Sequence, residues 1–354
     1  MYTYKHFIPE NIAPAGAKKI GVYDSGGRRI CGIPLGGLTP PEAQKRYSFC
    51  ALSDIHLTDQ TANEDFQRAL SYVNTSDCAF TCVAGDLTVA GTESELSLFK
   101  DTVAQYSPTK PVYAITGNHE TAWGNYITDE EIEPYTGKPL YYSFTQGDDV
   151  FIMLGYYGAY HEYPGLGWRW DEFLSVAELQ WLYETLEANR NKRCFVFEHV
   201  LPHEHGVGNP NGLYTSALIW KTADGGIGQA FMNLLKHYKN VVFFHGHSHT
   251  RFYLQELDKK ANYSEENGYK SVHIPSLALP RDVTSDGGAL EKIYAESEGY
   301  IVDVYDDCIV LNGRDFIDNE SDGHILPIAT YKIDTPRQTV AAGTFTDSTG
   351  TIVT

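Results

Sequence analysis

The chain has 354 residues, enough for one large α/β domain, and 42% of them are apolar, which supplies a sizeable core. Its formal net charge of −19 repels polyanions, so extended nucleic acid is not an expected partner; the acidity could equally serve only to keep the protein soluble. No apolar run reaches the length of a membrane helix and the first residues lack a signal-peptide pattern, which predicts no membrane span and a cytoplasmic location.

Composition divides the chain into three parts. Residues 1–45 are rich in Gly and Pro, which indicates an N-terminal extension with a hairpin near Ser25-Gly26-Gly27. Residues 46–329 carry the periodic pattern of one main domain. Residues 330–354 are rich in Thr and Gly, which predicts a C-terminal tail or a lone strand.

Within the main domain, short apolar strands alternate with amphipathic helices. The pattern predicts helices over 64–73, 93–106 and 228–238, and a further one after Ser175; Thr92 caps the second with Glu95 in a capping box. After residue 249 almost only strands are predicted, over 252–254, 271–274, 300–304 and 309–312. This order predicts an α/β fold: a four-layer α/β/β/α sandwich of two mixed sheets.

Polar residues follow five of the predicted strands directly. In chain order they are Asp54-Ile-His56, Gly85-Asp86, Gly117-Asn118-His119-Glu120, His199 and Gly246-His247-Ser248-His249. Because ligands of α/β sheets lie at the carboxyl ends of strands, we expect these side chains to meet at one edge. Mixed carboxylate and imidazole ligands suit Mn, Fe or Zn, and Asp86 could bridge two such ions.

These five motifs, in this order, resemble the calcineurin-like metallophosphoesterase family over residues 47–315. The resemblance implies that residues 46–329 are a catalytic domain with two metal ions bridged by Asp86. It implies that His119 binds no metal and faces the substrate phosphate as the catalytic residue. The implied ligands of the first ion are Asp54, His56 and His249, and those of the second are Asn118, His199 and His247. Singly, each has a plainer interpretation, such as a helix cap for Asp86 or a turn for Asn118.

Departures from the family pattern narrow the expected branch. The protein phosphatases carry a second aspartate and Arg-Gly soon after Gly-Asp, and the purple acid phosphatases carry a tyrosine ligand there. Here Gly85-Asp86 is followed by Leu-Thr-Val-Ala, and the third motif ends in Glu120 where many relatives have Asp. The sequence therefore looks most like the bacterial branch that acts on cyclic nucleotides and other small phosphodiesters.

The expected function is hydrolysis of a small phosphodiester by a hydroxide held between two Mn, Fe or Zn ions. One alternative is a phosphomonoesterase on the same site, for which Arg251 or Arg281 could supply a phosphate-binding cation. The other is a metal-binding interaction module without turnover. The sequence pattern sets neither the substrate nor the oligomeric state.

The other histidines have weaker signals. His203 and His205 follow His199 closely and are candidates for substrate binding or ordinary loop histidines. His245 is expected at a strand end, in packing or behind the ligands, and His273 is expected to be structural or exposed. Substrate choice should depend on the segments 120–140, 156–172, 200–226 and 280–297.

Overall fold

The computed structural model describes most of the main domain and parts of both ends. The described residues are 19–23, 29–34, 44–58, 60–121, 128–156, 160–163, 167–170, 174–200, 227–252, 262–265, 268–283, 290–292, 296–317, 325–336, 345–346 and 352–353.

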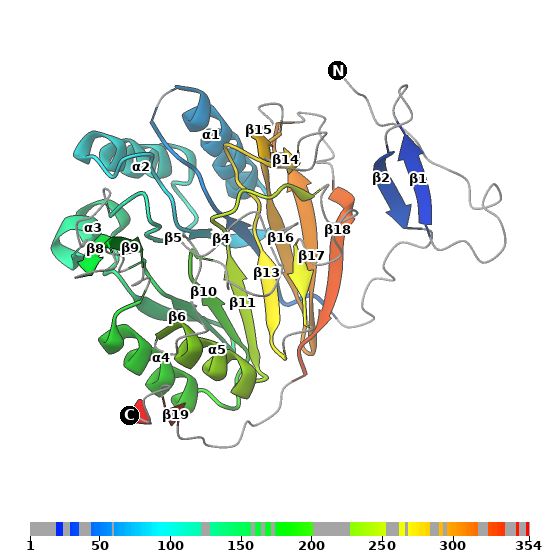
Figure 1. Cartoon of the computed structure of the whole chain (residues 1–354). Coiled ribbons are helices and arrows are strands. Elements are labelled where there is room, and N and C mark those ends of the chain that lie inside the picture. The colour runs from blue at the N-terminus through cyan, green and yellow to red at the C-terminus, as the bar shows by residue number, and fades with distance from the viewer. Residues whose placement is uncertain are drawn as a thin grey trace.

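Two six-stranded sheets form the centre of the fold (Figure 1). The first sheet has the order β18 (Ile325–Asp334), β17 (Cys308–Asp315), β16 (Glu298–Val304), β3 (Tyr47–Leu52), β4 (Cys78–Ala84) and β5 (Val112–Ile115). The second has the order β12 (Tyr263–Ser264), β13 (Lys270–His273), β11 (Val241–His245), β10 (Cys194–Phe197), β7 (Asp149–Met153) and β6 (Tyr142–Gln146). Parallel strands sit beside antiparallel ones in each, so both sheets are mixed.

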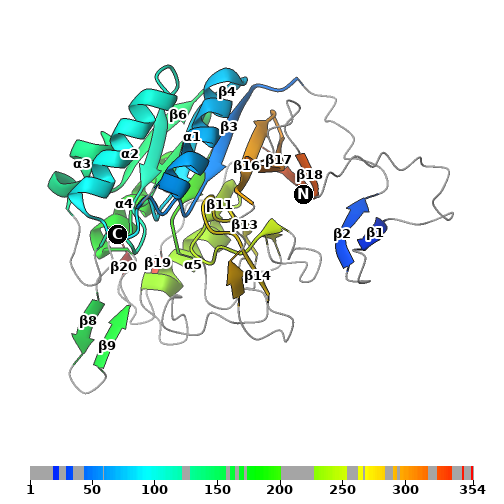
Figure 2. The same ribbon diagram turned by 90° about the horizontal axis from the view of Figure 1, so that it is seen from above.

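Helices cover the outer face of each sheet (Figures 1 and 2). The apolar faces of α1 (Gln60–Thr75) and α2 (Glu93–Tyr106) pack on the first sheet, and those of α4 (Val176–Ala188) and α5 (Ile227–His237) pack on the second. Between the sheets lies a core rich in phenylalanine, in which Phe49 stacks on Phe80 and meets Phe151 edge to face. The predicted four-layer α/β/β/α sandwich is therefore confirmed.

Two predicted helix caps are confirmed, those at Thr92 and Ser175, whereas Asn63, a candidate cap for the first helix, lies inside α1. The Thr92 hydroxyl accepts a hydrogen bond from the backbone N–H of Glu95, and the Glu95 carboxylate accepts one from the Thr92 backbone N–H; the Ser175 hydroxyl accepts one from the Glu178 backbone N–H. Such a cap stabilises a helix by about 1 kcal/mol because it pairs an amide that the helix leaves open. These caps fix where α2 begins, after β4, and where α4 begins, after β9.

Other elements differ from the prediction. The helix α3 (Asp129–Thr136) lies inside the segment 120–140, which was expected to be a substrate loop; its periodicity is weak because it is only two turns long and contains Pro134. The segments 156–172 and 280–297 contain the paired strands β8 (Tyr160–Tyr163) with β9 (Gly167–Trp170), and β14 (Arg281–Val283) with β15 (Leu290–Lys292).

The ends of the chain contain paired strands. The expected N-terminal hairpin is formed by β1 (Lys19–Tyr23) and β2 (Arg29–Pro34). The expected tail from residue 330 needs correction, because Thr330 to Asp334 belong to β18 and pair with β17, so the sheet continues past that boundary. Two short strands, β19 (Phe345–Thr346) and β20 (Ile352–Val353), pair near the C-terminus. The three-part division itself stays a prediction.

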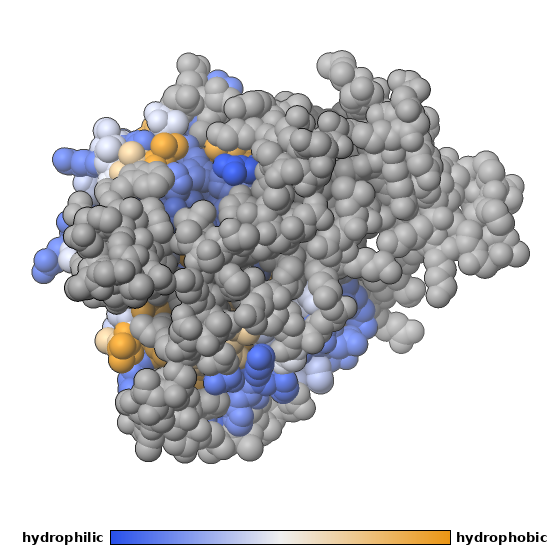
Figure 3. Space-filling model, in the orientation of Figure 1, coloured by the Kyte–Doolittle hydropathy of each residue, from blue (hydrophilic) through white to orange (hydrophobic). Residues whose placement is uncertain are grey.

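The described surface is mostly hydrophilic on the face shown in Figure 3, with small apolar patches. Val176, at the start of α4, is an exposed large apolar residue. Among the described helices, none is both long enough and apolar enough to cross a membrane.

Candidate metal centre

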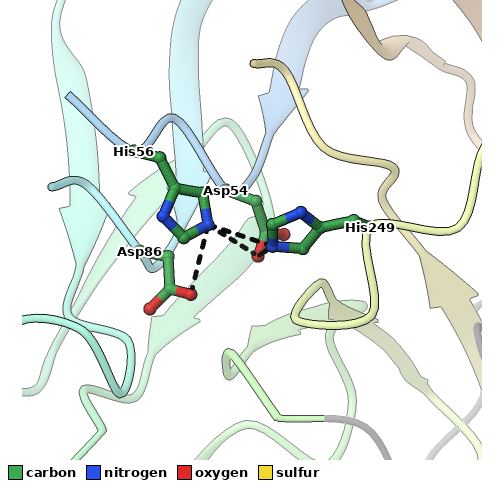
Figure 4. Close-up of side chains that lie close together, drawn as sticks. All are labelled: Asp54, His56, Asp86 and His249. Carbon is green, nitrogen blue, oxygen red and sulfur yellow. Dashed lines mark hydrogen bonds and ion pairs between the residues drawn. The ribbon is translucent and has the colours of Figure 1, made fainter. Parts of the chain in front are cut away.

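The loops that follow five strands converge at one edge of the sandwich. Asp54 and His56 follow β3, Asp86 follows β4, Asn118 follows β5, His199 follows β10, and His247 and His249 follow β11. All seven side chains are buried, with at most 9% of each residue exposed. Figure 4 shows Asp54, His56, Asp86 and His249 pointing at one another.

These four residues form a first cluster of candidate metal ligands. His249 Nε2 lies 3.1 Å from Asp54 Oδ1 and 3.0 Å from His56 Nε2 (Figure 4). His56 Nε2 in turn lies 3.5 Å from Asp86 Oδ2. Their ligand atoms lie within 4.8 Å of one another, the spacing expected of donors around one ion.

A second cluster shares Asp86 with the first and adds His199 and His247. His199 Nε2 lies 3.1 Å from Asp86 Oδ2 and 3.2 Å from His247 Nδ1. Asn118 lies between Gly117 and His119, which both contact Asp86, and its buried Oδ1 accepts no hydrogen bond from the part of the chain that the structure describes. The predicted residues thus gather into two groups joined by one carboxylate.

Backbone carbonyls set the orientation of two of these histidines. His199 Nδ1 lies 2.7 Å from the Ala84 carbonyl, and His249 Nδ1 lies 3.2 Å from the Leu279 carbonyl. Each Nδ1–H donates to its carbonyl, so in a neutral imidazole Nε2 presents a lone pair to the aspartates. A lone pair facing a carboxylate is unfavourable unless a cation lies between them. The residues therefore fit a pair of metal ions.

The charges of the centre also fit a pair of metal ions. Burial opposes ionisation of Asp54 and Asp86, yet the imidazoles around them hold the pKa of both carboxyls well below the usual value. Burial alone would lower the pKa of His199, but Asp86 and Asp54 raise it to about 10. Burial and the neighbouring His199 lower the pKa of His247 to about 3. The ionised aspartates thus hold one protonated imidazole where metal ions would supply the charge.

Five of the candidate ligands have left-handed backbone. Among the described residues, these are also the non-glycine residues with positive φ: Asp54, His56, Asp86, His247 and His249, with φ between 49° and 74°. Each costs of order 1–3 kcal/mol, and such strain concentrates where a site requires it. Gly85 also has positive φ, and a Cβ there would lie 2.7 Å from the His199 ring, so only glycine fits between these loops.

Both aspartates hold the loops as well as face the centre. Asp54 Oδ2 accepts the His247 backbone N–H at 3.0 Å, and Asp86 Oδ1 accepts that of His119 at 3.0 Å. Glu120, to which the sequence assigned no role, accepts hydrogen bonds from the Gly117 amide, the Thr88 amide and the Thr88 hydroxyl at 2.7 to 2.8 Å. Only the fold brings Thr88 to Glu120, so no local pattern could have shown this link.

His119 lies at the rim of the centre. Its Nε2 is 3.9 Å from Asp86 Oδ2, its side chain is 23% exposed, and its ring meets that of His56 edge to face. Its Nδ1 lies 2.6 Å from the Val89 carbonyl, which fixes the ring. His119 is therefore held beside Asp86 with part of its ring exposed.

The remaining candidates are two histidines and two arginines. His203 and His205 fall outside the described residues. Arg251 forms an ion pair with Glu296. The Arg281 backbone forms hydrogen bonds with those of His249 and Arg251, and its charge helps burial to lower the pKa of His249 to about 4. Arg281 therefore lies beside the first cluster.

Comparison with known proteins agrees with this geometry. A family model described as calcineurin-like phosphoesterase matches residues 47–251. A dimetal phosphatase structure from Danio rerio has a TM-score of 0.57 at 14% identity, covering 82% of this chain and 100% of that chain. The anchor in the inner membrane complex of Plasmodium has a TM-score of 0.53 at 11% identity, covering 83% and 90%.

A purple acid phosphatase from yellow lupin seeds has a TM-score of 0.51 at 15% identity, covering 89% of this chain and 59% of that chain. No curated protein matches the sequence. At these identities the solved structures support the fold alone, whereas the family model spans more than half of the chain and contains all five strand-end motifs. This chain belongs to the calcineurin-like phosphoesterase family.

Proposed function

We propose that this chain is a two-metal hydrolase of a small phosphodiester, such as a cyclic nucleotide. The observation that carries the proposal is the pair of ligand clusters that share Asp86. Asp54, His56 and His249 would hold one Mn, Fe or Zn ion, and Asn118, His199 and His247 would hold the other. The bacterial branch and the cytoplasmic location stay predictions from the sequence.

The bound ions would supply positive charge for the phosphoryl oxygens and an acidified water as the nucleophile. The protein's own residues define where the phosphate lies. Asp54 and Asp86 each use one oxygen to fix a loop amide, so their other oxygens are aimed at the centre before any ligand arrives. His199 and His249 are turned by their carbonyl partners so that Nε2 faces inward.

His119 would protonate the leaving oxygen. Because the Val89 carbonyl accepts from Nδ1, the proton that can move is the one on Nε2, the nitrogen nearer to Asp86. The leaving group of an alkyl diester is an alkoxide, which needs such a proton. This position at a partly exposed rim supports a role in leaving-group protonation.

One observation favours the phosphomonoesterase alternative. A monoester dianion carries one more negative charge than a diester, and Arg281 is a cation beside His249. If Arg281 binds the phosphate, monoesters should be the better substrates. The non-catalytic alternative, a metal-binding interaction module, shares the ligands but would give no turnover.

An activity panel separates these functions. The Mn²⁺-loaded chain would be assayed on bis(p-nitrophenyl) phosphate, p-nitrophenyl phosphate, cyclic nucleotides and phospholipid headgroup diesters. The Arg281→Gln variant would be assayed on the same substrates. We expect kcat/KM to be higher for the diesters, and Arg281→Gln to lower monoester turnover more than diester turnover. Higher kcat/KM for the monoesters would favour the phosphomonoesterase. A chain that holds both ions and hydrolyses nothing would support the interaction module.

A further inference from the structure

A buried polar network lies directly behind the loop that carries His247 and His249. Ser248 stands between these two candidate ligands and is fully buried. Its Oγ lies 2.8 Å from His273 Nε2 and 2.9 Å from Thr250 Oγ1. His273 is the last residue of β13, the strand next to β11, and it is also fully buried.

The hydrogen bonds of this network have one consistent direction. Asn262 donates its Nδ2 to the Phe252 carbonyl at 3.4 Å, so its Oδ1, 3.3 Å from His273 Nδ1, is the acceptor there. His273 therefore carries its proton on Nδ1 and accepts the Ser248 hydroxyl at Nε2. Burial lowers the pKa of His273 to about 3, which keeps this imidazole neutral.

The contact with Ser248 bears on both ligands at once. His247 and His249 have left-handed backbone, with φ of 74° and 60°, so the loop between them is strained. Ser248 N also donates to the Gly246 carbonyl at 2.9 Å, which makes a tight turn. A side chain fixed at the middle of such a turn restricts both flanking residues.

We propose that His273 is a positioning residue that holds the metal-ligand loop through Ser248. It touches neither ion nor substrate; it keeps the His247 and His249 rings aimed at the centre before metal binds. The inference rests on the proposed metal site, since it concerns two of the proposed ligands. Partners behind the ligands typically contribute about 10- to 100-fold in metal affinity.

Two amide variants separate the two contacts of His273. Glutamine reaches about as far as Nε2 and can still accept from Ser248, whereas asparagine reaches about as far as Nδ1 and cannot. We expect His273→Asn to weaken Mn²⁺ binding about 10- to 100-fold and His273→Gln to stay near wild type. Ser248→Ala should weaken binding as His273→Asn does, and the double variant should be no weaker than either, because both remove one contact.

The matched control is Ser271→Ala. It removes another buried serine–histidine contact, the 3.1 Å bond from Ser271 Oγ to His245 Nε2, without touching Ser248. Mn²⁺ dissociation constants would be measured by equilibrium titration with electron paramagnetic resonance, and thermal unfolding of the metal-free variants would report stability. Ser271→Ala should lower stability yet keep Mn²⁺ affinity.

Three results would overturn the inference alone: wild-type affinity in His273→Asn, weak binding in His273→Gln, or a Ser271→Ala loss as large as that of His273→Asn. A wild-type chain that binds no Mn²⁺ would overturn the proposed function first and the inference with it. The readout is metal affinity, which does not depend on knowing the substrate.

Discussion

Strand β10 has buried charge beside both of its ends, and the two ends balance it differently. At the starting end, Arg193 precedes β10 and binds both oxygens of Asp149, at 3.1 and 2.6 Å. Its other nitrogen donates to the Tyr305 carbonyl and the Thr335 hydroxyl at 2.9 Å, and Tyr47 donates to Asp149 at 2.7 Å. The charge of Asp149 is therefore balanced within the protein, because Arg193 supplies the cation.

At the finishing end, His199 after β10 belongs to the metal centre together with Asp54, which follows β3. There the aspartates face imidazole nitrogens, in two groups that could hold metal ions. Buried acid with an arginine partner is therefore structural, whereas buried acid surrounded by oriented imidazoles is a binding site. The comparison teaches that burial of charge alone does not mark function; the nature of the partner does.

The largest effect expected at the finishing end comes from Asp86→Asn. It removes the charge shared by both clusters, so the metal content should fall below one ion per chain and turnover should fall by about 1,000-fold or more. Elemental analysis and the diester assay would measure both. Asp65→Asn, at a buried carboxylate of α1 paired with Arg68, is the control that should retain both ions. Retention of two ions by Asp86→Asn would contradict the bridging role.

His119→Ala should keep both ions while turnover falls by about 100- to 10,000-fold, the usual contribution of a general acid. The loss should be larger for alkyl diesters than for nitrophenyl diesters, because an alkoxide needs the proton more. Equal losses would mean that His119 only stabilises phosphoryl charge. Loss of metal in the variant would show that His119 is a ligand after all.

At the starting end, Arg193→Met should cost about 3–5 kcal/mol of unfolding free energy, because Asp149 would stay buried without its cation. Arg190→Met is the control: its pair with Glu187 is partly exposed and should contribute about 1 kcal/mol or less. Urea denaturation would measure both. Similar losses of unfolding free energy in the two variants would contradict the view that the buried Arg193–Asp149 pair is structural.

Glu178 is a buried carboxyl group that the fold favours in its neutral form, and its substitution is expected to change stability least among these predictions. Burial, and then the charge of Glu198, raise the pKa of Glu178 well above its ordinary 4.5, so the fold favours the neutral acid. A raised carboxyl pKa is without cost below pH 4.5 and lowers stability as the pH rises above it. Glu178→Gln should therefore stabilise the protein by about 1 kcal/mol at pH 8 and by less at pH 5.

Denaturation at the two pH values would test this, with Glu184→Gln, at an exposed residue of the same helix, as the control. A gain that does not grow with pH would show that Glu178 is ionised in the fold.

The sequence predicted the sandwich and the polar residues at the strand ends because both depend on local patterns, and the family resemblance implied which seven of those residues are candidate ligands. Period-2 and period-3.6 apolar spacing gives strands and helices, and the ends of parallel strands must meet at one edge. The short helix α3 was not predicted, because two turns interrupted by Pro134 carry little periodicity. The pairing of β18 with β17, which runs past residue 330, was not predicted because the pairing of an edge strand leaves no local mark in the sequence.

The sequence by itself therefore determined which residue types reach the centre and in what order. Only the tertiary structure decided how they are held: the left-handed backbone of five ligands, the carbonyls that orient His199 and His249, and the contact from His273 to Ser248. Those features join residues far apart in the chain, and a hydrogen bond between distant residues depends on packing that no local spacing encodes.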